Sequence, residues 1–225
     1  MKAILLDFNG TLFFDSGFHL EAWGKIYREL SEKTDDEPGQ NFYCGPRNDV
    51  IIQQIAPWLT PKERMAYSHK KEALYRQICM ENPGQVHLVP GAEEFLHYLR
   101  EHQVPFLLVS ASIKENMDFY FRQFELNRWF DQSRCVYDDG TYANKGEMHL
   151  EAARRLGTIL SHCIVVEDSI SAIAHAKENG AGMIIGIGSD SVRDDLIHTG
   201  ADRVIRDFRE FDRKWLTPEI PIKKY

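Results

Sequence analysis

Short apolar runs in this sequence end in polar side chains that could carry out phosphate and metal chemistry. These side chains are Asp7 and Asn9 after residues 3–6, Ser110 after residues 105–109, and Glu167 and Asp168 after residues 163–166, with Lys145 at the start of an expected helix. Carboxylates from two strands can hold Mg²⁺. A lysine and a serine hydroxyl suit a phosphoryl group. The pattern therefore predicts phosphoryl transfer to Asp7, with metal and lysine offsetting the developing charge.

Asn9 stands two residues after this candidate nucleophile, where a second carboxylate able to shuttle a proton would be expected. An amide cannot transfer that proton. A positioned acid or base contributes on the order of 10²–10⁴-fold in rate, so we expect slow turnover of poor leaving groups unless Asp15 or His19 substitutes. The hydrolysis of acyl phosphates and activated aryl phosphates should be slowed least, because their leaving groups need less protonation.

The elements that must position these groups follow from the spacing of apolar residues. From Pro90 onward, helical patterns alternate with short apolar runs, which is typical of a parallel sheet with crossover helices. The expected strands are residues 3–6, 105–109, 135–137, 163–166, 183–187 and 203–205. Parallel strands present their carboxyl ends at one edge of the sheet, so the polar groups should converge there.

Helix-start signals divide the chain further. Thr60, Pro61 and Glu63 predict a capping box that opens a helix to about residue 80, and Ser112 with Glu115 predicts a second one that opens a helix to about residue 126. Residues 17–85 contain helical patterns and no convincing strand. We therefore expect an α/β protein with a three-layer, Rossmann-like core of residues 1–16 and 86–225 and an inserted all-helical cap domain of residues 17–85, with linkers that allow hinge motion.

Composition restricts the partners. The 225 residues carry a formal net charge of −7 and no concentrated basic patch, which argues against a nucleic-acid partner. The four cysteines are widely separated, which favours reduced thiols over a metal site. No apolar run resembles a signal peptide or reaches membrane-spanning length. We expect a cytoplasmic monomer that acts on a small phosphorylated metabolite, with no membrane partner.

Four segments of the sequence together resemble the motifs of the haloacid dehalogenase superfamily, and within it the capped phosphatases and β-phosphoglucomutases. They are Asp7-Phe8-Asn9-Gly10-Thr11-Leu12, Val109-Ser110-Ala111-Ser112, Asn144-Lys145-Gly146 and Val166-Glu167-Asp168-Ser169. With Pro90-Gly91 and residues 152–157, the resemblance covers nearly all of residues 1–206. The set is specific to the superfamily and does not specify a substrate.

The resemblance implies a role for each matching residue. Asp7 would attack phosphorus and become an aspartyl-phosphate, while Ser110 and Lys145 hold the phosphoryl oxygens. The implied Mg²⁺ ligands are Asp7, the backbone carbonyl of Asn9, Asp168, and Glu167 directly or through water. The implied substrate contacts are Gly10, Thr11, Ala111 and Ser112 in the motifs and His19, Arg47 and Lys71 in the cap. For Arg47 and Lys71 a solvated helix position is the alternative, and His19 could be an ordinary half-buried helix histidine.

Three departures from the family pattern keep several functions open. Asn9 replaces the usual second aspartate, Asp15 lies one place later than the family's linker acid, and the loop 112–116 is longer than the mutase loop. The leading hypothesis is a Mg²⁺-dependent phosphohydrolase, with a sugar phosphate as the first candidate substrate. A mutase needs proton transfer at two hydroxyls, so Asn9 weighs more heavily against it. A weakly active phospholigand-binding regulatory protein and an amide introduced to trap a complex are the other interpretations.

Overall fold

The computed structural model describes residues 2–31, 39, 42 and 47–217. The chain forms two compact units, one of Met1–Phe14 with Leu88–Tyr225 and one of Asp15–His87. Each unit has its own buried core.

The larger unit is built on a six-stranded parallel sheet with the order β3-β2-β1-β4-β5-β6. The strands are β1 (Ala3–Leu6), β2 (Phe106–Ser110), β3 (Val136–Tyr137), β4 (Cys163–Glu167), β5 (Met183–Ile187) and β6 (Arg203–Ile205). All six expected strands are confirmed. The strand order reverses between β1 and β4, and ligands of open α/β sheets bind in the crevice outside the strand ends at such a point.

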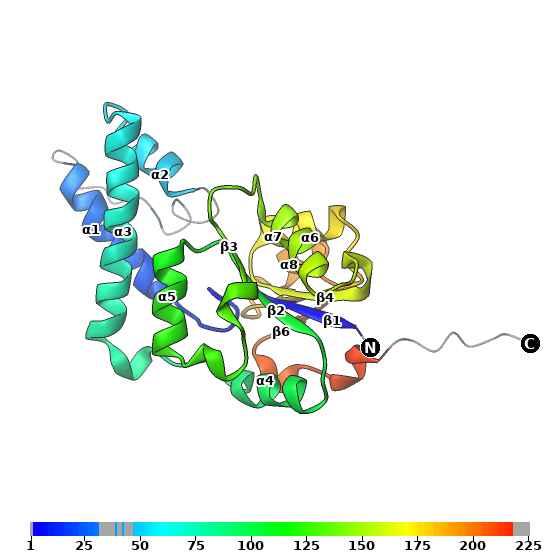
Figure 1. The fold of residues 1–225 in the computed structure, drawn as a ribbon. Helices are drawn as coiled ribbons and strands as arrows, with labels where there is room; N and C mark the ends of the chain where they lie inside the picture. The colour runs from blue at the N-terminus through cyan, green and yellow to red at the C-terminus, as the bar shows by residue number, and fades with distance from the viewer. Residues whose placement is uncertain (1, 32–38, 40–41, 43–46, 218–225) are drawn as a thin grey trace, which may run out of the picture. The chain divides into compact units, whose positions relative to one another are not determined.

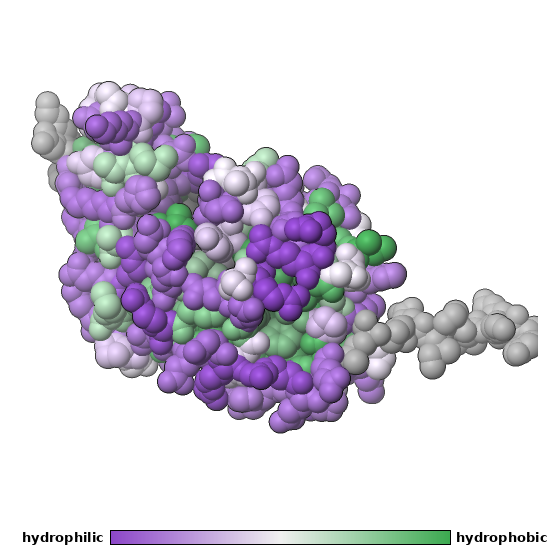
Figure 2. Space-filling model, in the orientation of Figure 1, coloured by the Kyte–Doolittle hydropathy of each residue, from purple (hydrophilic) through white to green (hydrophobic). Residues whose placement is uncertain are grey.

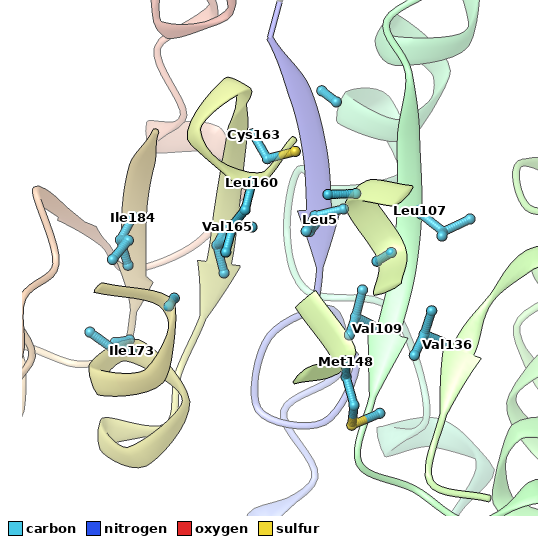
Figure 3. Packing of buried hydrophobic residues seen from close by; sticks show 14 of the residues in the cluster. Leu5, Leu107, Val109, Val136, Met148, Leu160, Cys163, Val165, Ile173 and Ile184 are labelled. Carbon is cyan, nitrogen blue, oxygen red and sulfur yellow. The ribbon is translucent and has the colours of Figure 1, made fainter. Parts of the chain in front are cut away.

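Helices cover both faces of this sheet. α6 (Lys145–Arg155), α7 (Ile170–Glu178) and α8 (Arg193–Thr199) lie on one side, and α4 (Ala92–Glu101) lies on the other (Figure 1). Strand residues such as Leu5, Val109 and Val165 pack in the buried cluster beneath the first group of helices (Figure 3). Every residue of β1 and β4 is buried, as in parallel strands covered on both faces. The three-layer, Rossmann-like core is confirmed.

The described residues of the smaller unit form helices joined by turns and contain no strand. Its helices are α1 (Ser16–Leu30), α2 (Asn48–Ile55) and α3 (Pro61–Glu81), followed by a 3₁₀ turn at Pro83–Gln85. The capping box predicted at Thr60 and Glu63 is confirmed, since each side chain bonds the other residue's backbone N–H. Trp23, Ile26 and Ile52 are among the residues of its apolar core.

The capping box predicted at Ser112 and Glu115 is wrong. α5 (Lys114–Gln123) begins after Ile113, whose side chain cannot cap, and it ends before residue 126. The hydroxyl of Ser112 instead donates a 2.7 Å hydrogen bond to Oδ1 of Asn9. The hydrogen bond from Ser112 to the distant Asn9 thus replaces the expected capping hydrogen bond within the helix.

Three of the four cysteines, Cys79, Cys135 and Cys163, are buried free thiols, and Cys44 lies outside the described residues. Burial raises the pKa of Cys79 and Cys135 to about 12, which makes both poor nucleophiles. No helix in the described part of the chain is both long and apolar enough to cross a bilayer. On the face shown in Figure 2, hydrophilic residues cover most of the surface and apolar residues form small groups.

Candidate active site

The two central strands deliver three carboxylates to one edge of the sheet. Leu6 of β1 is in register with Val166 of β4, and the backbone N–H of Asp7 donates to the carbonyl of Val166 at 3.1 Å. Glu167 is the last residue of β4, and Asp168 follows it directly. Oxygen atoms of Asp7, Glu167 and Asp168 all lie within 4.8 Å of one another. The structure therefore brings together the carboxylates that the sequence places after these two strands.

Lys145 joins the carboxylates from the first turn of α6. Asn144 caps this helix by accepting from the backbone N–H of Glu147, which places Lys145 at its first residue. Nζ of Lys145 forms an ion pair with Oδ1 of Asp7 and lies 2.9 Å from Oε1 of Glu167. Burial alone would lower the pKa of Lys145, but the charges of Asp7 and Glu167 raise it. The lysine is therefore a fixed cation between two buried acids.

Three carboxylates lie close together beside Lys145. Burial raises the pKa of Asp7 to about 7, and the charge of Glu167 adds to this effect while Lys145 opposes it. Burial would also raise the pKa of Glu167, but Lys145 and His149 lower it to about 2. Lys145 pairs with Asp7 and Glu167, and the carboxylate of Asp168 lies beside these two acids. Buried carboxylates gathered this way are stabilised by a cation.

The donor set fits a divalent cation that prefers oxygen ligands. Gly10 makes room for one of these ligands, since a Cβ built on it would lie 2.0 Å from Oδ2 of Asp168. Its backbone also has a φ of +72°, which favours glycine. The turn after Asp7 is therefore shaped to let the Asp168 carboxylate approach the backbone. An acidic cluster able to hold a metal ion is present, and the role of Asn9 as a backbone ligand stays a prediction.

The side chain of Asn9 lies among three hydroxyl groups. Its Oδ1 accepts from Ser112 Oγ at 2.7 Å and from Ser110 Oγ at 3.2 Å, while its Nδ2 donates to the hydroxyl of Tyr120 at 2.7 Å. Ser110, the last residue of β2, is buried, and Ser112 is half-buried. Ser110 Oγ also accepts from the backbone N–H of Ser112 at 3.2 Å. These contacts place the phosphate-binding candidates of β2 directly against residue 9.

The remaining motif residues divide between surface and interior. Ala111 is exposed just after β2, beside the half-buried Ser112. Thr11 is fully buried, and its Oγ1 has no hydrogen-bond partner among the described residues. Its contact with substrate stays a prediction.

A family model for haloacid dehalogenase-like hydrolases matches residues 1–180 of the chain. The protein belongs to this family. Validoxylamine A 7'-phosphate phosphatase of Streptomyces hygroscopicus subsp. limoneus is 23% identical over 214 residues, covering 93% of this chain and 95% of the relative. β-Phosphoglucomutase of Bacillus subtilis is 24% identical over 229 residues, covering 97% and 95%. The crystal structure of a HAD hydrolase, family IA, variant 3, from Entamoeba histolytica has a TM-score of 0.88 and 30% identity, covering 96% of this chain and 97% of that chain. The protein is accordingly an enzyme of the phosphatase or phosphotransferase type, and the predicted family resemblance is confirmed.

Two of the three cap residues expected in a haloacid dehalogenase-like enzyme lie together in the smaller unit. Nζ of Lys71 is 2.6 Å from Nδ1 of His19 and 2.9 Å from Oε1 of Glu72, and Lys71 is only 3% exposed. Nε2 of His19 lies 3.2 Å from Oδ2 of Asp15. Lys71 is thus not the solvated helix lysine of the alternative interpretation.

Arg47 has a different environment. It is exposed at the start of α2, where its Nε lies 3.3 Å from Oδ1 of Asp49. The roles of His19, Arg47 and Lys71 toward a substrate stay predictions.

The sequence alone did not indicate two residues that touch the site. His149 lies one helical turn after Lys145, is 1% exposed, and has Nε2 3.7 Å from Oε1 of Glu167. Burial lowers its pKa, which favours the neutral imidazole. Its spacing of four residues from Lys145 was a usable signal, because such residues share a helix face. Tyr120 offered no signal, since a buried aromatic residue in an amphipathic helix looks like core.

Proposed function

We propose that this enzyme is a Mg²⁺-dependent phosphohydrolase that acts on a small phosphorylated metabolite through an aspartyl-phosphate on Asp7. The observation that carries this proposal is the convergence of Asp7, Lys145 and the Glu167–Asp168 pair at one edge of the sheet. A sugar phosphate is the first candidate substrate. Support for it comes from the two relatives that match over nearly the whole chain, a validoxylamine A 7'-phosphate phosphatase and a β-phosphoglucomutase.

In the proposed reaction a carboxylate oxygen of Asp7 attacks phosphorus. The new P–O bond forms as the bond to the leaving oxygen breaks, and that oxygen departs with the electron pair and takes up a proton. Lys145 and Ser110 would hold the phosphoryl oxygens during transfer. Water then attacks the phosphorus of the aspartyl-phosphate and releases Asp7 and inorganic phosphate.

Asp7, Asp168, Glu167 and the backbone carbonyl of Asn9 would hold Mg²⁺. When bound, the ion would offset negative charge on the phosphoryl oxygens. The leaving oxygen must also be protonated, and residue 9, an asparagine, is not an acid that could do this. We propose that residues 17–85 act as a cap. Asp15 and His19, which lie 3.2 Å apart in the smaller unit, are the candidates for supplying the proton.

Two further functions have support in particular observations. The β-phosphoglucomutase relative favours phosphoryl transfer between hydroxyls of a hexose, although such transfer needs a proton donor and acceptor at both hydroxyls. The hydrogen bonds that occupy the Asn9 amide favour a weakly active phospholigand-binding protein. One assay of phosphate release distinguishes both alternatives from the phosphohydrolase.

The test is a panel of phosphate compounds with Mg²⁺ or with EDTA, followed by phosphate release. We expect release from acetyl phosphate and p-nitrophenyl phosphate to exceed that from sugar phosphates, and Asp7→Asn to reduce all rates to background. Full activity of Asp7→Asn would remove the nucleophile assignment. Isomerisation of a hexose phosphate without net phosphate release would favour the mutase, and tight binding without product over hours would favour the phospholigand-binding protein.

A further inference from the structure

Tyr120 is held rigidly against the first motif. It is fully buried in α5, and its ring stacks on that of Phe8 with centroids 4.2 Å apart and planes 25° apart. Phe8 directly follows the candidate nucleophile Asp7. The position of the Tyr120 hydroxyl is therefore determined by ring packing, and this hydroxyl lies 2.7 Å from Nδ2 of Asn9.

The two ends of the Asn9 amide have different hydrogen-bonding properties. The oxygen end accepts from the hydroxyls of Ser110 and Ser112, and the nitrogen end donates to Tyr120. If the amide turned over, its nitrogen would face both serine hydroxyls, which would then have to accept and direct their protons elsewhere. The orientation of the amide thus decides where the serine protons point.

We propose that Tyr120 is a positioning residue for the active site. Its hydroxyl accepts from Nδ2 and holds the Asn9 amide in place, and the amide oxygen in turn orients the hydroxyls of Ser110 and Ser112. This role rests on the proposed function, because the two serines would meet the phosphoryl group and the substrate there.

The proposal makes the hydroxyl of Tyr120 matter most when residue 9 is an amide. A carboxylate has two equivalent oxygens, so it has no reversed orientation, and it can accept from both serines whichever way it turns, with the Tyr120 hydroxyl as a third donor. By contrast, the packing of the Tyr120 ring on Phe8 and the 3.3 Å contact of its hydroxyl with Oγ of Ser112 do not depend on the side chain of residue 9. The two contributions are therefore separable in a double-mutant cycle.

The cycle combines Tyr120→Phe, which keeps the ring, with Asn9→Asp. In the unmodified background we expect Tyr120→Phe to lower kcat/KM for p-nitrophenyl phosphate by roughly three- to ten-fold, the effect of one hydrogen bond. In the Asn9→Asp background we expect a smaller loss. Tyr98→Phe, which removes a hydroxyl from α4 in the same unit, is the control and should be neutral in both backgrounds. An equal loss in both backgrounds would overturn the proposal, because Tyr120 would then act through the direct contact with Ser112 or through packing, and not through the amide of Asn9.

A second measurement does not need activity. In protein labelled with ¹⁵N-asparagine, the Nδ2 signals of Asn9 are those lost in Asn9→Asp, and we expect their hydrogens to exchange with water more slowly than those of the exposed Asn127. Tyr120→Phe should remove part of this protection. Exchange as fast as that of Asn127 in the unmodified protein would refute the positioning of Asn9. Protection without phosphate release from any compound would instead refute the proposed function and leave the orientation of the amide established.

Discussion

Gly10 and Asp168 occupy adjoining space so closely that a single methyl group at residue 10 would collide with the carboxylate. A Cβ placed on Gly10 with ideal geometry would lie 2.0 Å from Oδ2 and 2.5 Å from Cγ of Asp168. The absence of a side chain at Gly10 therefore leaves room for the carboxylate of Asp168, which follows β4 about 160 residues later in the chain.

Gly10→Ala should weaken metal binding because the methyl group displaces Asp168. We expect Mg²⁺ affinity to fall at least about ten-fold, the scale seen when the surroundings of a metal ligand are disturbed, as measured by isothermal titration calorimetry. Gly157→Ala is a matched control, since Gly157 has the same φ of +72° and a Cβ placed on it would meet nothing within 4 Å. Both variants should lose about 1 kcal/mol of unfolding free energy from backbone strain. Equal Mg²⁺ affinity in the two variants would contradict the role of the Gly10–Asp168 contact.

Asn9→Asp should raise turnover, because it restores an acid where an amide now stands. The hydroxyls of Ser110, Ser112 and Tyr120 can all donate to a carboxylate, so the variant should fold. The same hydrogen bonds favour the charged form, so we expect the gain in kcat for sugar phosphates near the lower end of the range for acid–base catalysis, about 10²-fold. Acetyl phosphate, with its better leaving group, should gain less. Identical rates for the two proteins across the panel would contradict the role assigned to residue 9.

Much of this architecture could be predicted because its signals are local. The six strands are short apolar runs, and the groups at their ends are adjacent in sequence to the strands that carry them, so a parallel sheet places them at one edge. Thr60 and Glu63 form their capping box because both partners lie within one helical turn.

Other features depended on contacts that no local pattern contains. Ser112 has the same capping signature as Thr60, yet its hydroxyl bonds Asn9, which is 103 residues away. Tyr120 meets Asn9 across 111 residues, through a buried position that periodicity assigns to the core. The short helix α8, with no side-chain cap, was not predicted at all. Sequence patterns thus located the acids, the lysine and Ser110, and the family resemblance added Ser112, but tertiary structure was needed to find Tyr120 and the hydrogen bonds that all three hydroxyls make with Asn9.

Lys145→Met should destabilise the larger unit, because it leaves Asp7 and Glu167 buried without their cation. Removing one partner of a buried ion pair typically costs about 3–5 kcal/mol, and chemical denaturation should show a loss of this order without added metal. If the site holds a divalent cation, Mg²⁺ should raise the melting temperature of Lys145→Met more than that of the unmodified protein. Lys114→Met is the control, since Lys114 forms an exposed pair with Asp118. A loss no greater than that of the control would contradict the charge balance inferred for the site.

Glu72 should make the smaller unit sensitive to acid. Burial alone would raise the pKa of Glu72, but Lys71, His19 and a hydrogen bond from Asn48 lower it to about 2, from an ordinary value of 4.5. Because the folded-state pKa lies below the unfolded one, the charged carboxylate stabilises the fold above about pH 4.5, and this contribution is lost as the pH falls toward 2. The shift corresponds to about 3 kcal/mol.

Glu72→Gln isolates this contribution, because glutamine keeps the shape of the side chain and does not titrate. We expect the unfolding free energy of the unmodified protein, measured by urea denaturation between pH 6 and pH 3, to fall more steeply than that of Glu72→Gln. At pH 6 the variant should be the less stable protein, since Lys71 loses its 2.9 Å partner, and the difference should narrow with acidification. Glu21→Gln, which removes an exposed pair with Lys25 in the same unit, should leave the slope unchanged. Parallel pH profiles for the unmodified protein and Glu72→Gln would show that Lys71 and His19 do not hold the Glu72 carboxylate in its charged form.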